Sequence, residues 1–136
     1  MQGAKNLHRI HLWYAIYLYV KGDACMQIKT RRDGAVLAVH LTGELDHHSA
    51  APLRAELDAL LQDDGIGHLV LDLGGVSFMD SSGLGVVLGR YKILKARRGS
   101  LRIIGASKPV ERILKMAGVY ALLGQQEGME RGASHV

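Results

Sequence analysis

The residues best suited to chemistry lie in a stretch where a predicted strand and loop give way to a helix. Asp80 is followed directly by Ser81 and Ser82. A helix begins with unpaired backbone N–H groups and the positive end of its dipole, so a phosphate on either serine could be accommodated without unfolding the helix. On local chemistry alone the simpler interpretation is better, namely that these three residues cap the helix.

A hydrolase is the main alternative from another class of function, because serine, histidine and aspartate are all present. Ser81 or Ser82 could act with His47 or His48. However, the G-x-S-x-G motif is missing, and Asp80 directly precedes the serine instead of orienting a histidine from a distance. The adjacent histidines should also diverge on a helix, unlike an i, i+4 pair of metal ligands. We therefore expect neither an enzyme nor a metal site.

Hydrophobic periodicity predicts the elements that must position these residues. Four short strand-like runs are expected, at residues 27–30, 35–41, 68–73 and 101–104. An Asp-Gly pair at residues 33–34 indicates a hairpin between the first two. Helices are expected at 47–62, 81–96 and from Ser107 to Gly118. The order β-β-α-β-α-β-α needs crossover connections, so we expect one α/β domain with helices packed on a mixed sheet of about four strands.

The apolar positions predict which side of each helix faces the core. The first helix should turn four leucines inward, at Leu53, Leu57, Leu60 and Leu61. The second should bury Leu84, Val87, Leu88, Tyr91 and Leu94. Its basic residues have the spacing of a solvated face and lack interleaved aromatics, so we expect no nucleic-acid binding: Arg90, Lys92, Lys95, Arg97 and Arg98.

The composition is typical of one folded domain in a reducing compartment. The chain has 136 residues, 48% of them apolar, and a formal charge of +4. Its single cysteine, Cys25, rules out an internal disulfide. The cytoplasm is therefore the expected location, and no membrane partner is expected.

The first 25 residues differ in character from the rest. Residues 10–20 form an apolar run of 11 residues, whereas a membrane-spanning helix needs about 20. Asp23 and the missing small-residue pattern also argue against a cleaved signal peptide. We expect residues 1–25 to be an extension, non-native or disordered, with Met26 as the natural start. The alternatives are an interfacial anchor or an added strand.

Two motifs closely resemble one known family. They are GELDHHSA at residues 43–50 and FMDSSGLGVVLGRYK at residues 78–92. Both resemble the sporulation-type anti-sigma factor antagonists of the STAS-domain family. The resemblance covers about residues 26–122 and implies a STAS-like fold for a domain at 26–123, followed by a polar tail at 124–136. The end of the chain departs from the family pattern, because residues 119–123 are not followed by a full strand and helix.

The resemblance implies a phosphorylation switch. In that family the first serine after the aspartate of the DSSG run is phosphorylated by the cognate anti-sigma factor, a serine kinase that uses ATP. In this sequence the serine at the matching position is Ser81. The unmodified protein would bind the kinase in its ADP form and displace the sigma factor, and a metal-dependent serine phosphatase would restore it. The chain itself would need no cofactor and would be a monomer when free.

The kinase should bind a rim around Ser81. Crossover topology puts the turn at residues 43–47 and the start of the second helix at one end of the sheet. The expected partner-binding residues are Gly43, Glu44, Leu45, Asp46, His47, Asp80, Ser82, Gly83, Leu84 and Gly85. The two last glycines lack bulk and would let the partner's backbone approach. Asp46 has a rival role as a helix cap, and a STAS module of another partner-switching or ligand-sensing pathway is the alternative function.

Overall fold

The computed structural model describes residues 14–20 and 23–125 of the chain. Five strands form one sheet in sequence order: β1 Tyr14–Val20, β2 Asp23–Asp33, β3 Val36–Leu45, β4 His68–Met79 and β5 Ser100–Ile104. Four helices are labelled from α2 onwards: α2 Ala50–Leu60, α3 Ser81–Ala96, α4 Lys108–Met116 and α5 Val119–Leu123. None of the helices in these described ranges has the length and hydropathy needed to cross a membrane.

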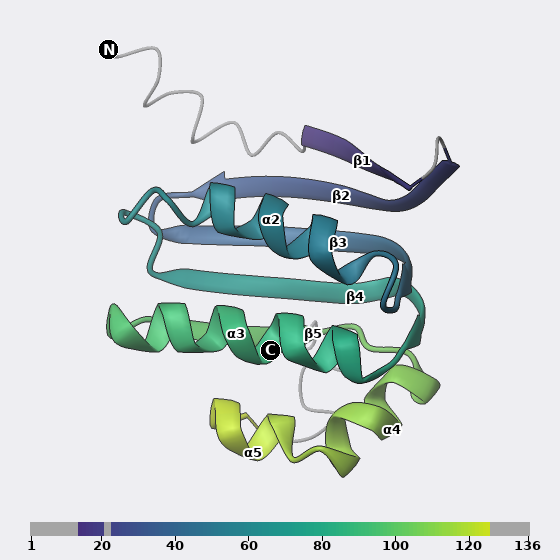
Figure 1. Ribbon diagram of the computed structural model, residues 1–136. Coiled ribbons are helices and arrows are strands. Elements are labelled where there is room, and N and C mark those ends of the chain that lie inside the picture. Colours follow the sequence, from purple (N-terminus) through teal and green to yellow (C-terminus); the bar gives the residue numbers. More distant parts are fainter. Residues whose placement is uncertain (1–13, 21–22, 126–136) are drawn as a thin grey trace.

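The sheet is mixed, as the sequence predicts. The pairs β1–β2 and β2–β3 are antiparallel, whereas β3–β4 and β4–β5 are parallel. Figure 1 shows α2 and α3 side by side on one face of the sheet, with α4 and α5 beyond the β5 edge. Alternate residues point toward these helices and are buried, among them Leu37, Val39, Leu41, Leu69 and Leu71. The expected single α/β domain is confirmed.

The sheet contains one strand more than expected. This additional strand, β1, lies in the N-terminal segment expected to be an extension. It pairs with β2 from Tyr14 opposite Thr30 to Val20 opposite Asp23, and Leu18 is buried. The strand is uncharged and rich in aromatic and β-branched residues, which favours its addition to the open edge of β2. The expected count of about four strands was therefore one too low, and the structure shows the added-strand alternative for residues 14–20.

Helix α3 has the predicted bounds, and the five side chains expected to face inward contact the core: Val87 and Leu94 are buried, and Leu84, Leu88 and Tyr91 are partly buried against it. Its buried residues are Gly83, Val86, Val87, Arg90 and Leu94. The prediction that Arg90 lies on a solvated face was wrong, because its side chain is only 7% exposed between α2 and α3, with Nε 3.1 Å from Asp58 Oδ1. Burial lowers the pKa of the Arg90 guanidinium, although the neighbouring Asp58 carboxylate opposes that change. The long aliphatic stem of an arginine can pack like an apolar side chain, which hydrophobic periodicity does not reveal.

Candidate functional site

The first turn of α3 has the geometry of a capped helix. Asp80 Oδ1 accepts hydrogen bonds from the backbone N–H of Ser82 at 2.8 Å and of Gly83 at 3.4 Å. The capping role predicted for Asp80 is therefore confirmed. Ser81 is the first residue of the helix and is exposed, whereas Ser82 is half-buried. The Ser81 side chain is therefore accessible while the helix stays folded.

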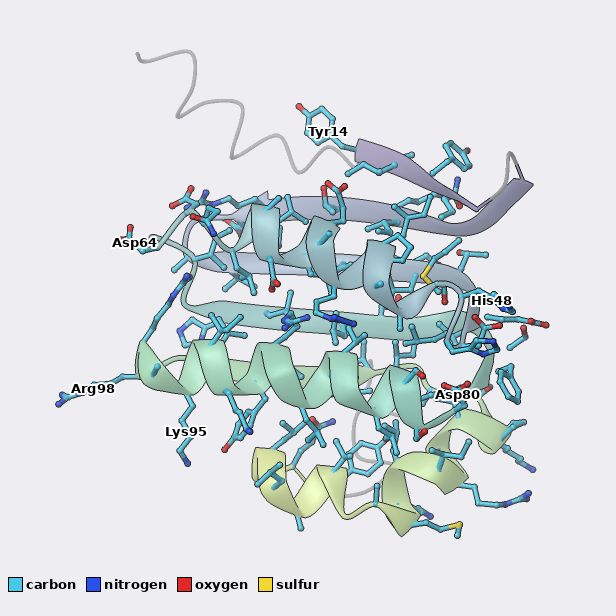
Figure 2. All side chains as sticks on the ribbon, in the orientation of Figure 1. Tyr14, His48, Asp64, Asp80, Lys95 and Arg98 are labelled. Atoms are coloured by element: carbon cyan, nitrogen blue, oxygen red, sulfur yellow. The ribbon has the colours of Figure 1, made fainter. Side chains whose placement is uncertain are left out.

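The turn after β3 lies beside Asp80, the residue before Ser81. Leu45 at the end of β3 pairs with Met79 at the end of β4, and the Asp80 N–H donates to the Leu45 carbonyl at 3.3 Å. His47 Nδ1 lies 4.0 Å from Asp80 Oδ2. Figure 2 shows His48 and Asp80 at one end of the molecule, opposite the end that carries Asp64 and Arg98. The parallel strands thus bring the two sequence motifs together, as the topology predicts.

Asp46 organises the turn that leads into α2. Its Oδ1 accepts from the N–H of His48 at 2.9 Å and of Ser49 at 3.1 Å, while Ser49 Oγ donates to the Glu44 carbonyl at 2.7 Å. The helix begins at Ala50, three residues later than expected, because this turn occupies residues 47–49. Asp46 thus stabilises the turn before α2, whereas the N-cap of the helix is Ser49, so the expectation that Asp46 caps this helix was wrong.

The adjacent histidines do not diverge as they would on a helix. His47 and His48 lie in the turn, with ring centroids 3.9 Å apart. Each ring has a carboxylate near it, at 4.0 Å for Asp80 and 3.9 Å for Asp46. Within the described ranges, no group of three or more potential metal-ligating side chains is found.

The backbone bonds to Asp46 affect its ionisation. Burial would raise its pKa, but the N–H groups of Ser49 and His48, and then the nearby His48 and His47 rings, hold the pKa below its ordinary value of 3.8. A carboxyl group with a lowered pKa in the folded state stabilises the protein above its unfolded-state pKa. That contribution is lost as the pH falls through the folded-state pKa.

We expect Asp46→Asn to lower the free energy of unfolding at pH 7 by about 0.5–1 kcal/mol, because the charge-assisted bonds are weakened. The deficit should shrink as the pH falls from about 5 to about 3, where the wild-type carboxylate loses its charge. Urea unfolding across this range checks the prediction, with Asp64→Asn in an exposed loop as the control. A deficit of the same size at all pH values would contradict it.

A shallow cavity of about 350 Å³ lies between α2 and α3, next to the serines. It is lined by His47, Ala50, Ala51, Arg54, Ser82, Gly85 and Val86. Sequence reasoning named three of these and missed Ala50, Ala51, Arg54 and Val86. The sequence spacing could have predicted Arg54, because it follows Ala50 by four residues and so lies on the same face of α2.

Not every residue expected to contact a partner is accessible. Leu45 is 1% exposed and belongs to the core. Gly83 is buried, and a Cβ atom there would lie 2.7 Å from Met79 Cγ and 2.8 Å from Leu45 Cγ. A Cβ atom at Gly85 would meet nothing within 4 Å. Of the two glycines, only Gly85 leaves open space for a partner, whereas Gly83 allows the helix to pack closely on β3.

The remaining rim residues differ in exposure. Glu44 is exposed, and Leu84 is half-buried against the core. Gly43 has φ of 129°, a backbone conformation that favours glycine, and pairs with Val76 of β4. The accessible part of the rim therefore consists mainly of polar groups around Ser81 and the cavity.

The family model for the STAS domain matches residues 27–129. The chain belongs to the STAS domain family. This match and the geometry above confirm the resemblance that the two motifs indicated. The STAS domain includes both the turn at residues 43–47 and the start of α3.

Relatives of this STAS domain include anti-sigma factor antagonists. An anti-sigma F factor antagonist of Paenibacillus polymyxa is 41% identical over 98 residues, which cover 72% of this chain and 84% of the relative. An anti-sigma-B factor antagonist of Staphylococcus aureus is 32% identical, covering 77% of this chain and 96% of the relative.

Solved structures of the anti-sigma factor antagonist SpoIIAA share the fold. The unphosphorylated form has a TM-score of 0.59 and 25% identity, covering 79% of this chain and 82% of that one. The phosphorylated form of the Bacillus protein has a TM-score of 0.57 and 22% identity, covering 91% of this chain and 97% of that one.

Proposed function

We propose that this STAS protein is an anti-sigma factor antagonist controlled by phosphorylation of Ser81. The unphosphorylated form binds an anti-sigma factor that is also a serine kinase, in its ADP form, and thereby releases a sporulation-type sigma factor. The observation that carries the proposal is the exposed Ser81 at the start of α3, directly after Asp80, which contacts the turn at residues 43–47. The 41% identity to an anti-sigma F factor antagonist supports it.

Electrostatics explains why one phosphate would abolish binding. Phosphorylation adds a charge of roughly −1.5 to −2 at neutral pH. On Ser81 that charge would stand next to the Asp80 carboxylate, and the turn that contacts Asp80 also carries Glu44 and Asp46. Desolvating such a cluster against a partner is costly, whereas the helix start can carry a phosphate without unfolding. The switch therefore changes binding and leaves the fold intact.

The catalytic chemistry belongs to the partners in this proposal. The kinase supplies ATP in its phosphorylating form, and a metal-dependent serine phosphatase removes the phosphate. The antagonist acts in the cytoplasm as a binding protein with no cofactor. His47 lies beside Asp80 with its ring 70% exposed, which suits contact with a partner better than proton transfer to Ser81.

The proposal is tested by titrating the unphosphorylated protein into a complex of the cognate anti-sigma kinase with ADP and its sigma factor. We expect release of the sigma factor and a new antagonist–kinase complex, both measured by analytical size-exclusion chromatography. Addition of ATP should reverse the exchange as Ser81 is phosphorylated. Retention of the sigma factor at saturating antagonist would contradict the proposed function.

A STAS module of another partner-switching pathway is the second candidate. The 32% identity to an anti-sigma-B factor antagonist favours it to a lesser degree. The same titration with a kinase of the sigma-B type discriminates the two, because partner choice depends on side chains around Ser81 and not on the fold.

A further inference from the structure

The cavity between α2 and α3 has an apolar floor and a lining without acidic groups. Ala50 and Val86 are its buried lining residues, whereas Ala51 and Gly85 are small and exposed. A Cβ atom on Gly85 would meet nothing within 4 Å, so the cavity is open at this position. No Asp or Glu of the described ranges lines it. An acidic side chain that enters from a partner would therefore meet no like charge on the cavity wall.

Arg54 gives this cavity a positive charge. It follows Ala50 by one turn of α2, lines the cavity and is exposed. In the part of the chain that the structure describes, Arg54 has no ion pair. Asp58, one turn further along α2, pairs instead with Arg90 of α3, at 3.1 Å between Oδ1 and Nε. The Arg54 guanidinium is therefore available to a carboxylate from another molecule.

The buried Arg90 guanidinium adds to the positive charge beside the cavity. Arg90 follows Val86, a lining residue, by one turn of α3. Its Nη1 atom is buried and has no hydrogen-bond partner among the described residues. Burial, and to a smaller extent the positive charge of Arg54, lowers the pKa of Arg90. Two guanidinium groups thus stand against the single carboxylate of Asp58, which favours a further negative charge in the cavity.

We propose that the cavity between α2 and α3 binds an Asp or Glu side chain of the anti-sigma kinase, with the Arg54 guanidinium as its partner. The inference rests on the proposed function and names the chemistry that the kinase must present beside Ser81. A planar guanidinium can donate two parallel hydrogen bonds to a carboxylate. The turn at residues 43–47 and Asp80 are acidic, so the binding surface has an acidic side and a basic side. This division fixes the orientation of the kinase on the antagonist.

Isothermal titration into the cognate kinase with ADP tests the role of Arg54. We expect Arg54→Ala to bind about tenfold and Arg54→Glu about a hundredfold more weakly than the wild type, with Arg54→Lys between the wild type and Arg54→Ala. Lys95→Glu is the matched control, because it makes the same change of charge on an exposed side chain that Figure 2 shows pointing away from the sheet. It should bind like the wild type. Urea unfolding of each variant checks that the fold is retained.

A charge exchange identifies the kinase side chain. Each exposed Asp or Glu of the kinase is replaced by Lys, and we expect one replacement to bind Arg54→Glu at least tenfold more tightly than the unmodified kinase does. Restored binding by none of them would overturn the inference.

The wild-type titration separates this inference from the proposed function. No binding of the wild type to the kinase with ADP would contradict the proposed function, and the inference with it. Wild-type binding together with unchanged affinity in Arg54→Ala and Arg54→Glu would overturn the inference about the cavity alone. Tighter binding by Arg54→Ala would also overturn it, because the occupant would then be basic or apolar.

Discussion

Ser81→Ala should take up no phosphate from the cognate anti-sigma kinase and ATP, whereas the wild-type protein should gain one. Ser81 is exposed at the first position of α3, so its hydroxyl can reach the active site of a kinase. Ser82 is half-buried and its N–H is bonded to Asp80, so its hydroxyl is less accessible for phosphorylation. Intact-protein mass after incubation measures the effect.

Ser82→Ala is the matched control, because it removes the same hydroxyl one residue away and leaves the Asp80 cap in place. It should gain one phosphate, like the wild type. A phosphate lost only in Ser82→Ala would move the switch to that residue. No phosphate on any form, with a kinase proved active on another substrate, would favour a STAS module that works without phosphorylation.

The same variants separate phosphorylation from binding. Ser81→Ala should bind the kinase in its ADP form as tightly as the wild type, since it adds no charge to the rim. Ser81→Asp places a carboxylate beside Asp80 and should bind about ten- to a hundredfold more weakly, which corresponds to about 1.4–2.7 kcal/mol. Isothermal titration with kinase and ADP measures both, and equal affinities would contradict the electrostatic switch.

Local signals explain which parts of the fold could be predicted. The bounds of α3 followed from Asp80 before the helix and Gly99 after it, and both are features of the chain near the helix itself. The burial of Arg90 could not be predicted from nearby residues, because it depends on Asp58 and the neighbouring helix α2. Residues 14–20 were similarly ambiguous, since an apolar run becomes a strand only where a partner edge is free.

The candidate site was likewise predictable only in part from the sequence. The proximity of Ser81 and the turn at residues 43–47 followed from topology, because adjacent parallel strands end at the same edge. The different environments of Gly83 and Gly85 did not follow, since both are small residues of one helix turn. Only the tertiary contacts of Gly83 with Leu45 and Met79 show that it has a packing role.

That difference predicts opposite effects for the same substitution. Gly83→Ala should lower the free energy of unfolding by about 1–3 kcal/mol, because the new methyl group would lie within 3.0 Å of Met79 and Leu45 unless they shift. Gly85→Ala should raise it by up to about 1 kcal/mol, since alanine favours a helix over glycine and meets nothing within 4 Å. Urea unfolding of the two variants and the wild type measures both changes.

The pair also separates packing from partner contact at the rim. Gly85→Ala puts a methyl group at the cavity between α2 and α3 while the fold is preserved, so weaker kinase binding in this variant would come from the lost space. Gly83→Ala lowers stability, so any loss of binding in this variant should follow its loss of folded protein and disappear under conditions that restore folding. Equal stability of Gly83→Ala and the wild type would mean that the side chains of Leu45 and Met79 can shift without loss of free energy of unfolding. The close approach of α3 to β3 would then not be what holds Ser81 in place.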